Sequence, residues 1–232
     1  MLDEAFEALK TYDWGTDPKV LAPIEEAVVT SHGNADARKD LETRLAAVLT
    51  SGVSRDAKDY ACRKLMLIGT AQSVPTLAGL LTDNDLSHMA RYALERIPAA
   101  EAGQALRDAL SKVSGPLQVG VIGSLGARHD AEATAPIAAL LNNADPSIAR
   151  AAAIALGDIG TAEAAKALAD AKPSAPGAAQ VAADATLACA EDLLAAGKKA
   201  EALAVYKSLA GENQPKNVRL AATRGMLACA GK

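Results

Sequence analysis

The sequence predicts an all-α protein, a right-handed α-α superhelix made of stacked helical hairpins. Half of its 232 residues are hydrophobic while only 3% are aromatic, so the expected core consists of Ala, Leu, Val and Ile. Small side chains suit closely packed helices, because alanine adds no bulk between backbones and has the best helix propensity. A β-sheet protein usually needs more β-branched and aromatic residues. A regular repeat along the chain is the second observation that favours helices.

The repeat is marked by one leucine near the end of each expected first helix. These anchor leucines follow one another at intervals of 29, 31, 31 and 31 residues: Leu65, Leu94, Leu125, Leu156 and Leu187. Residues eight and four positions before the anchors are apolar, and those three positions after them mostly are, which marks one helical face. A second apolar stripe begins twelve residues after the first four anchors, at Leu77, Leu106, Ile137 and Leu168. A unit this short cannot bury its own apolar face, so the units are expected to stack.

Candidate capping and turn residues stand at the helix boundaries that the repeat predicts. An N-cap candidate stands eleven residues before each of four anchors: Ser54, Asp83, Ser114 and Asp145. Gly69 and Gly160 follow their first helices, where a left-handed residue is favoured. Periodicity and helix boundaries therefore predict the same hairpins.

The segment DPSIARAAAIALGDIGT (145–161) resembles the HEAT repeat, in the short form of about 30 residues found in HEAT-like subunits of phycobilin lyases. The resemblance covers residues 54–171, although Pro98 replaces the turn glycine and Arg128-His129 replace Ile-Gly. It implies an α-solenoid whose second helices line a concave, partner-binding surface, and it implies no catalytic residues. Farther along, LLAAGKKAEALAVYKSLA (193–210) resembles a single tetratricopeptide hairpin.

The chain is expected to form a single continuous solenoid with three parts. These are an N-terminal helical cap (1–52), four HEAT-like repeats (53–172) and C-terminal helical repeats with the tetratricopeptide-like hairpin (173–232), the last part opening on a linker, KPSAPG.

The cap holds half of the chain's six aromatic residues, Phe6, Tyr12 and Trp14. We expect this cluster to close the end of the array, and a recognition role for Trp14 is the alternative. At the other end, the helix expected within 212–232 should leave apolar surface exposed.

Several functional classes are disfavoured by composition. A net charge of −4 without any Lys/Arg run argues against nucleic-acid binding. Apolar runs such as APIAALL (135–141) are far shorter than the roughly 20 residues that span a bilayer, so no membrane insertion is expected. No signal peptide is recognised in the chain as given, which leaves a cytoplasmic location or export with the signal removed.

Catalytic chemistry has no visible constellation in the sequence. The three cysteines, Cys62, Cys189 and Cys229, are far apart, and we expect them to be buried apolar residues. The histidines His32, His88 and His129 fall in three different repeats or caps. We therefore expect no catalytic residues, no metal site, no cofactor and no enzyme activity.

Partner-binding residues are expected on the second helices, because positions ten and fourteen after an anchor face away from the core. The candidates at these positions are Pro75, Gly79, Gln104, Asp108, Lys166 and Asp170. Arg107, which is next to Asp108, is added to them. They predict a non-enzymatic protein–protein interaction scaffold that binds a peptide or helical partner. The oligomeric state stays open, with a monomer favoured over an oligomer. Alternatively, the two charge-poor second helices, expected within 71–81 and 131–141, are covered by the N-terminal helices or by another copy.

Two other functions stay open at this stage. The resemblance to phycobilin-lyase subunits allows an accessory subunit of a lyase-type enzyme, which should bind a bilin. The second alternative is an interaction module of a larger exported bacterial protein.

Overall fold

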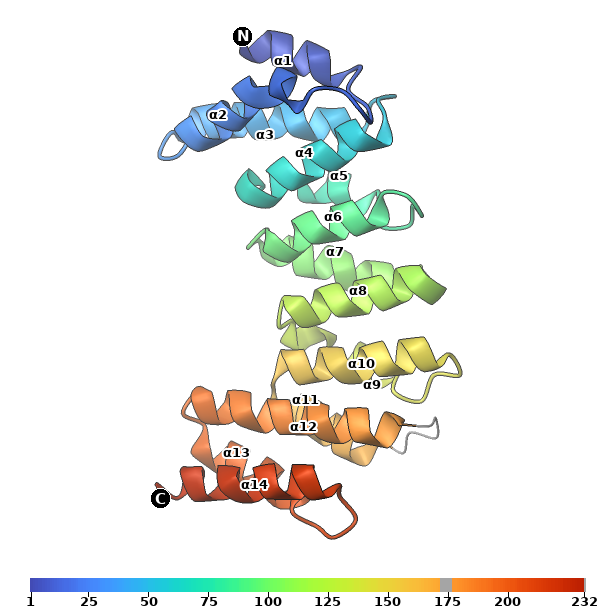
Figure 1. Cartoon of the computed structure of the whole chain (residues 1–232), viewed down its shortest axis with the longest axis vertical. Helices are drawn as coiled ribbons and strands as arrows, with labels where there is room; N and C mark the ends of the chain where they lie inside the picture. Colours follow the sequence, from blue (N-terminus) through green and yellow to red (C-terminus); the bar gives the residue numbers. More distant parts are fainter. Residues whose placement is uncertain (172–176, 232) are drawn as a thin grey trace. The chain divides into compact units, whose positions relative to one another are not determined.

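The computed structural model describes residues 1–171 and 177–231, and these residues contain helices and no strands. They form two compact units, Met1–Val113 and Ser114–Lys232. Within each unit, helical hairpins stack on one another (Figure 1). The predicted all-α, HEAT-like solenoid fold is thus confirmed, whereas the predicted division at residues 52 and 172 stays a prediction.

The first unit begins with helices that precede the regular hairpins. Its elements are α1 (Leu2–Leu9), the 3-10 turn η1 (Pro18–Leu21), α2 (Ala22–Thr30), α3 (Ala35–Leu49), α4 (Arg55–Ile68), α5 (Val74–Ala78), α6 (Ser87–Arg96) and α7 (Ala100–Leu110). The longer helices α3, α4 and α6 pack in sequence, and the second helices α5 and α7 lie beside each other behind them (Figure 1).

The second unit repeats this arrangement. Its elements are α8 (Gly115–Ala127), the 3-10 turn η2 (Ala131–Ala133), α9 (Thr134–Ala138), α10 (Pro146–Ile159), α11 (Ala162–Asp170), α12 (Ala178–Ala195), α13 (Lys199–Leu209) and α14 (Lys216–Cys229). Here α10 packs between α8 and α12, while α11 contacts both α9 and α13. The predicted linker falls mostly on 172–176, outside the described residues.

The predicted apolar stripes form the core. The first four anchors are buried, and so are all four residues that start the second stripe. The fifth anchor is wrong: Leu187 is only partly buried, and α12 instead buries Thr186, Ala190 and Leu193. Counting on from Leu156 at the repeat interval therefore places the buried face of α12 one residue too far along, at Leu187 instead of Thr186.

Helix ends confirm most of the predicted caps. Ser54 Oγ accepts from the Ala57 N–H at 3.0 Å, and Asp145 Oδ1 accepts from the Ser147 N–H at 2.8 Å. Ser114 makes no side-chain cap hydrogen bond, and Gly115, which follows it, has a left-handed φ of +54°.

The two turn glycines serve different purposes. Gly160 is left-handed as predicted, with a φ of +69°, but Gly69 is extended, with φ −61° and ψ 146°. A Cβ at Gly69 would lie 2.5 Å from the Leu65 carbonyl oxygen and 2.8 Å from Ile97 Cδ1. Close packing alone therefore requires Gly69. Gly160 is required by its left-handed backbone and also by packing, because a Cβ there would lie 2.6 Å from Asp192 Oδ2.

Small residues set the distance between the first helices of the second unit. A Cβ at Gly126 of α8 would lie 2.9 Å from the Ala155 Cα of α10. A Cβ at Gly157 of α10 would lie 3.1 Å from the Ala185 Cα of α12. These glycines permit the close packing that the Ala-rich composition predicted.

A buried carboxylate links two layers of the first unit. Glu42 of α3 is 2% exposed and accepts hydrogen bonds from the Thr70 N–H at 2.7 Å and the Ser73 N–H at 3.2 Å. The Thr70 hydroxyl donates to both carboxylate oxygens, at 3.1 and 3.0 Å. Glu42 thus satisfies polar groups of the turn that leads into α5, as buried polar groups require.

A pair of glycine substitutions on α8 should have opposite effects on stability. Gly123 is exposed and no atom lies within 4 Å of the position that a Cβ would take, so Gly123→Ala should raise the free energy of unfolding by about 1 kcal/mol. Gly126→Ala gains the same propensity but forces α10 to move, so it should lower stability by about 1–3 kcal/mol. Urea unfolding followed by circular dichroism measures both. If both variants were stabilised, the close approach would be wrong.

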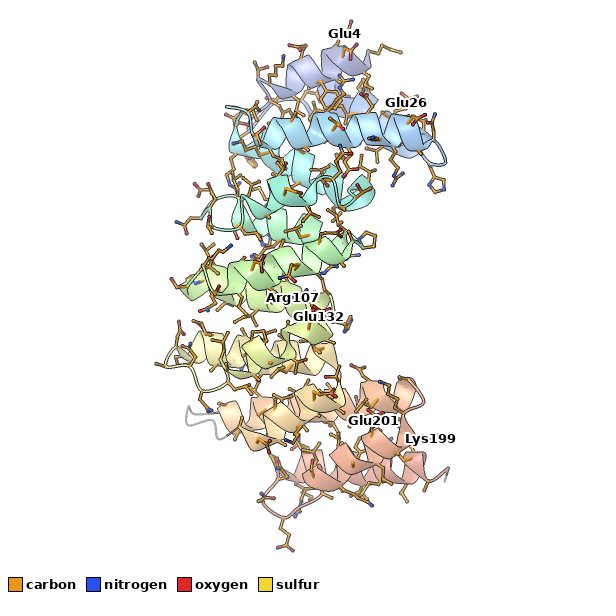
Figure 2. All side chains as sticks on the ribbon, turned by 180° about the vertical axis from the view of Figure 1, so that it is seen from behind. Glu4, Glu26, Arg107, Glu132, Lys199 and Glu201 are labelled. Atoms are coloured by element: carbon orange, nitrogen blue, oxygen red, sulfur yellow. The ribbon has the colours of Figure 1, made fainter. Side chains whose placement is uncertain are left out.

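Removing the Glu42 carboxylate should destabilise the first unit. Glu42→Ala leaves the Thr70 and Ser73 donors without their acceptor, and we expect a loss of about 3 kcal/mol. The matched control is Glu26→Ala on the exposed surface of α2, which should change stability by less than about 0.5 kcal/mol (Figure 2). Equal urea midpoints for the two variants would contradict the role assigned to Glu42.

Candidate functional site

A groove of about 280 Å³ lies between the second helices of the first unit, α5 and α7. Its α5 side consists of Val74, Pro75, Ala78, Leu81 and Thr82. Its α7 side consists of Glu101, Gln104, Ala105, Asp108, Ala109 and Lys112. Among these, Val74, Leu81 and Ala109 are buried and form an apolar floor. The charged and amide side chains are exposed, so they form a polar rim around that floor.

The rim carries an ordered chain of hydrogen bonds along α7. Arg107 Nη2 donates to Gln104 Oε1 at 2.9 Å, and Gln104 Nε2 donates to Asp108 Oδ1 at 2.7 Å. The Gln104 amide is therefore held in one orientation by a donor and an acceptor on its own helix. Arg107, labelled in Figure 2, is half-buried and does not line the groove.

Charge is distributed unevenly along this rim. Glu101 and Asp108 place two carboxylates along α7, and Lys112 follows the end of the helix. Successive residues on this face are three or four positions apart, as one side of an α-helix requires. A ligand in the groove therefore meets negative charge over most of α7 and positive charge at its end.

The predicted partner-binding residues are divided between the two units. In the first unit, Pro75, Gln104 and Asp108 line the groove, while Gly79 and Arg107 lie outside its lining. Gly79 is exposed at the end of α5.

The remaining two predicted residues, Lys166 and Asp170, lie on α11 of the second unit. There Lys166 Nζ is 3.6 Å from Asp170 Oδ2, and both side chains are exposed. An exposed ion pair of this kind contributes little to stability. A binding role for any of the seven residues stays a prediction.

Sequence reasoning missed Glu101, Ala105 and Lys112. It selected the outward-facing positions of each second helix, ten and fourteen residues after the anchor. A groove between neighbouring helices is lined instead by the sides of the two helices that face each other. These residues lie seven, eleven and eighteen positions after Leu94. Helical periodicity at three- and four-residue steps from Gln104 and Asp108 would have indicated them.

The cysteine and histidine residues do not line the groove between α5 and α7. Cys62 and Cys189 are buried, and burial raises the pKa of each thiol to about 12, so both stay protonated at neutral pH. His129 Nδ1 makes a hydrogen bond with the Asp158 carbonyl oxygen, which ties the turn after α8 to the end of α10. Within residues 1–171 and 177–231, no group of three or more His, Cys, Asp or Glu side chains could hold a metal ion.

A larger cavity, of about 690 Å³, lies in the second unit between α11, α12, α13 and the turn that precedes α14. Ala171 and Ala179 are part of its wall. Among the described helices, none is both long enough and apolar enough to cross a membrane.

Comparisons with solved structures find similar helical repeat proteins at low identity. An engineered protein has a TM-score of 0.46 and 21% identity, over 98% of this chain and 68% of that one. The complex of CpcE and CpcF of phycocyanin lyase from Nostoc sp. PCC7120 has a TM-score of 0.46 and 19% identity, over 99% and 94%. A designed armadillo repeat protein has a TM-score of 0.38 and 16% identity, over 99% and 100%. At these TM-scores the likenesses carry no argument about function.

Comparison of the sequence with known families identifies one kind of helical repeat. No curated protein matches the chain. The family model of the HEAT repeats matches residues 104–189, which include the segment 145–161 that resembles this repeat. Residues 104–189 of this chain are therefore similar to HEAT repeats.

Proposed function

We propose that this protein is a non-enzymatic scaffold that binds an extended peptide segment of a partner protein in the groove between α5 and α7. The observation that carries the proposal is the combination of an apolar floor with an ordered polar rim in one groove. Recognition sites commonly pair apolar burial with a few well-placed polar groups that fix orientation.

The dimensions of the groove favour a peptide over a folded surface or a small molecule. A volume of about 280 Å³ lies at the lower limit of typical small-molecule pockets, and the groove is open to solvent. An extended peptide can place small apolar side chains on the floor formed by Val74, Leu81 and Ala109. Its backbone N–H groups can then reach the Asp108 carboxylate at the rim.

The charges of the rim favour a particular kind of peptide. Glu101 and Asp108 would attract Lys or Arg side chains next to the apolar segment, while Lys112 would attract a carboxylate farther along. A short apolar motif with basic residues on one side therefore fits the groove best.

The proposal that the protein is not an enzyme rests on the side chains present. Among the described residues that line the groove there is no His, Cys, Ser or Tyr, the residues that most often act as nucleophile or general base beside a carboxylate. The lyase-subunit alternative predicts a bound bilin, and a spectral titration without any bilin absorbance change would remove it.

Peptide binding in this groove should depend on Asp108. Peptides selected from a random display library on the wild-type protein should bind Asp108→Arg about tenfold more weakly, because the charge over α7 is reversed and the Gln104 amide loses its acceptor. Fluorescence anisotropy with a labelled peptide measures the dissociation constant.

Two further variants complete this experiment. Glu26→Arg on α2 reverses an exposed charge outside the groove, so it should leave the affinity unchanged. Asp170→Arg on α11 tests the candidate pair of the second unit in the same assay. Equal peptide affinity for wild type and Asp108→Arg would contradict the assignment of this groove.

A further inference from the structure

We propose that the outer face of α14 binds an acidic amphipathic helix of a partner protein. This contact is independent of the α5–α7 groove, because α14 belongs to the second unit. Three observations select the partner: two exposed leucines at helical spacing, a set of cations without ion pairs, and the helix-to-helix packing that the same unit already uses.

The exposed leucines lie on the side of α14 that faces away from the core. This helix packs against α12 and α13 (Figure 1), and it buries Val218, Ala222 and Gly225. Leu220 and Leu227 are 58% and 51% exposed. Each follows a buried residue by two positions, which at about 3.6 residues per turn places it on the opposite side of the helix. The two leucines therefore form one apolar row opposite the core.

The spacing of this row favours a helical partner. Leu220 and Leu227 are seven residues apart, which is roughly 10 Å along the helix axis. Amphipathic helices present anchor residues three, four and seven positions apart, whereas the side chains on one face of an extended peptide are roughly 7 Å apart. The second unit also buries apolar rows between neighbouring helices, since α10 packs between α8 and α12. A helix laid along α14 would continue this packing.

The hairpin of α13 and α14, with its turns, is a basic region on an acidic protein. Residues 196–231 carry six Lys or Arg and two acidic residues, whereas residues 1–195 carry 17 Lys or Arg and 26 acidic residues. The net charges of the two segments are therefore +4 and −9. Within α14 itself there are three cations, Lys216, Arg219 and Arg224, and no acidic residue. A partner with carboxylates is attracted to this region and repelled by most of the remaining chain.

The basic side chains of this hairpin are not neutralised within the chain. Over residues 1–171 and 177–231, no ion pair involves any of the six Lys or Arg side chains of 196–231. Lys216 lies four residues before Leu220 and Arg224 four residues after it, so the two exposed cations flank the leucine row on opposite sides. A partner helix therefore matches this face if it carries an apolar row with Asp or Glu on both flanks.

Other occupants match this face less well. Two copies meeting through α14 would place the same cations against each other. A nucleic acid is bound mainly through its phosphates, which gives the leucine row no role and exposes the phosphates to the net negative charge of residues 1–195. A membrane surface requires a broad apolar face on the helix, whereas the large apolar side chains that α14 exposes are Leu220 and Leu227.

The size of the contact predicts a transient complex. With 14 residues, α14 is roughly 21 Å long, so one helix laid along it covers a small area. Interfaces below about 1,200 Å² are typical of weak and transient complexes. Charge attraction contributes much of the association in such a complex, so the affinity should fall as the salt concentration rises.

A display library of scaffolded helices with a randomised outer face tests the chemistry of the partner. Clones are selected on the wild-type chain, and those that also bind the double variant Leu220→Ser with Leu227→Ser are removed, so the remaining clones depend on the leucine row. We expect these clones to carry apolar residues at three- and four-residue spacing with Asp and Glu on both sides. Remaining clones that are basic, or the survival of no clone, would overturn the proposal.

The cations are tested separately with one selected helix and fluorescence anisotropy. Arg224→Glu should bind it about tenfold more weakly, because a carboxylate replaces a cation beside the row. Lys39→Glu on α3 makes the same change at an exposed position of the first unit and should bind like wild type. Asp108→Arg, which alters the α5–α7 groove, should also leave this affinity unchanged.

A matched control for the leucines is the double variant Val29→Ser with Leu67→Ser, which removes two exposed apolar side chains of the first unit. It should bind the selected helix like wild type, and circular dichroism confirms that each variant is folded. Equal affinity for wild type and Arg224→Glu would overturn the proposal. So would self-association that is lost in the α14 double variant, or tighter binding of duplex DNA or phosphatidylserine vesicles that this variant leaves unchanged.

Discussion

Each hairpin of this chain presents one apolar stripe that only a neighbouring hairpin can cover. The hairpins are too short to enclose a core of their own, so burial takes place between α8, α10 and α12 in one unit and between α3, α4 and α6 in the other. The side chains along these contacts are small, and glycines such as Gly126 and Gly157 allow the backbones to come close. Stability in such an array is a sum of neighbour contacts, so a local change should act mainly on one layer.

Polar ties with a similar sequence separation complement the apolar contacts. Glu42 binds the turn at Thr70, 28 residues ahead, and Arg38 Nη2 donates to the Leu67 carbonyl oxygen, 29 residues ahead, at 2.9 Å. In the second unit, His129 bonds to the Asp158 carbonyl oxygen, again 29 residues ahead. Each tie satisfies a backbone group at a helix end or turn that would otherwise lack a partner. Apolar stripes alone permit sliding between layers, whereas these directional bonds define the register.

The repeat frame could be predicted from sequence because it depends on periodic burial and on local caps. Leu65, Leu94, Leu125 and Leu156 are buried as expected, since each interval reproduces one hairpin. The prediction failed where the role of a residue depends on its contacts with a neighbouring helix. A Cβ at Gly69 would meet Ile97 of the next repeat as well as the Leu65 carbonyl oxygen of its own helix, and no local pattern reveals the contact with Ile97. Of the predicted residues in the first unit, Pro75, Gln104 and Asp108 line the groove. Periodicity indicates the residues beside them on each helix, but choosing the flank that lines a groove requires knowing which helices are neighbours.

The aromatic residues at the start of the chain also differ in whether the sequence predicts their burial. Leu2, Phe6 and Leu9 have helical spacing, and the structure places Phe6 and Leu9 in the core. Trp14 lies beyond that helix in a turn, where periodicity gives no direction to a side chain, and composition alone suggested that it would join the cluster. The turn instead points the indole into water through hydrogen bonds among Asp13, Trp14 and Thr16.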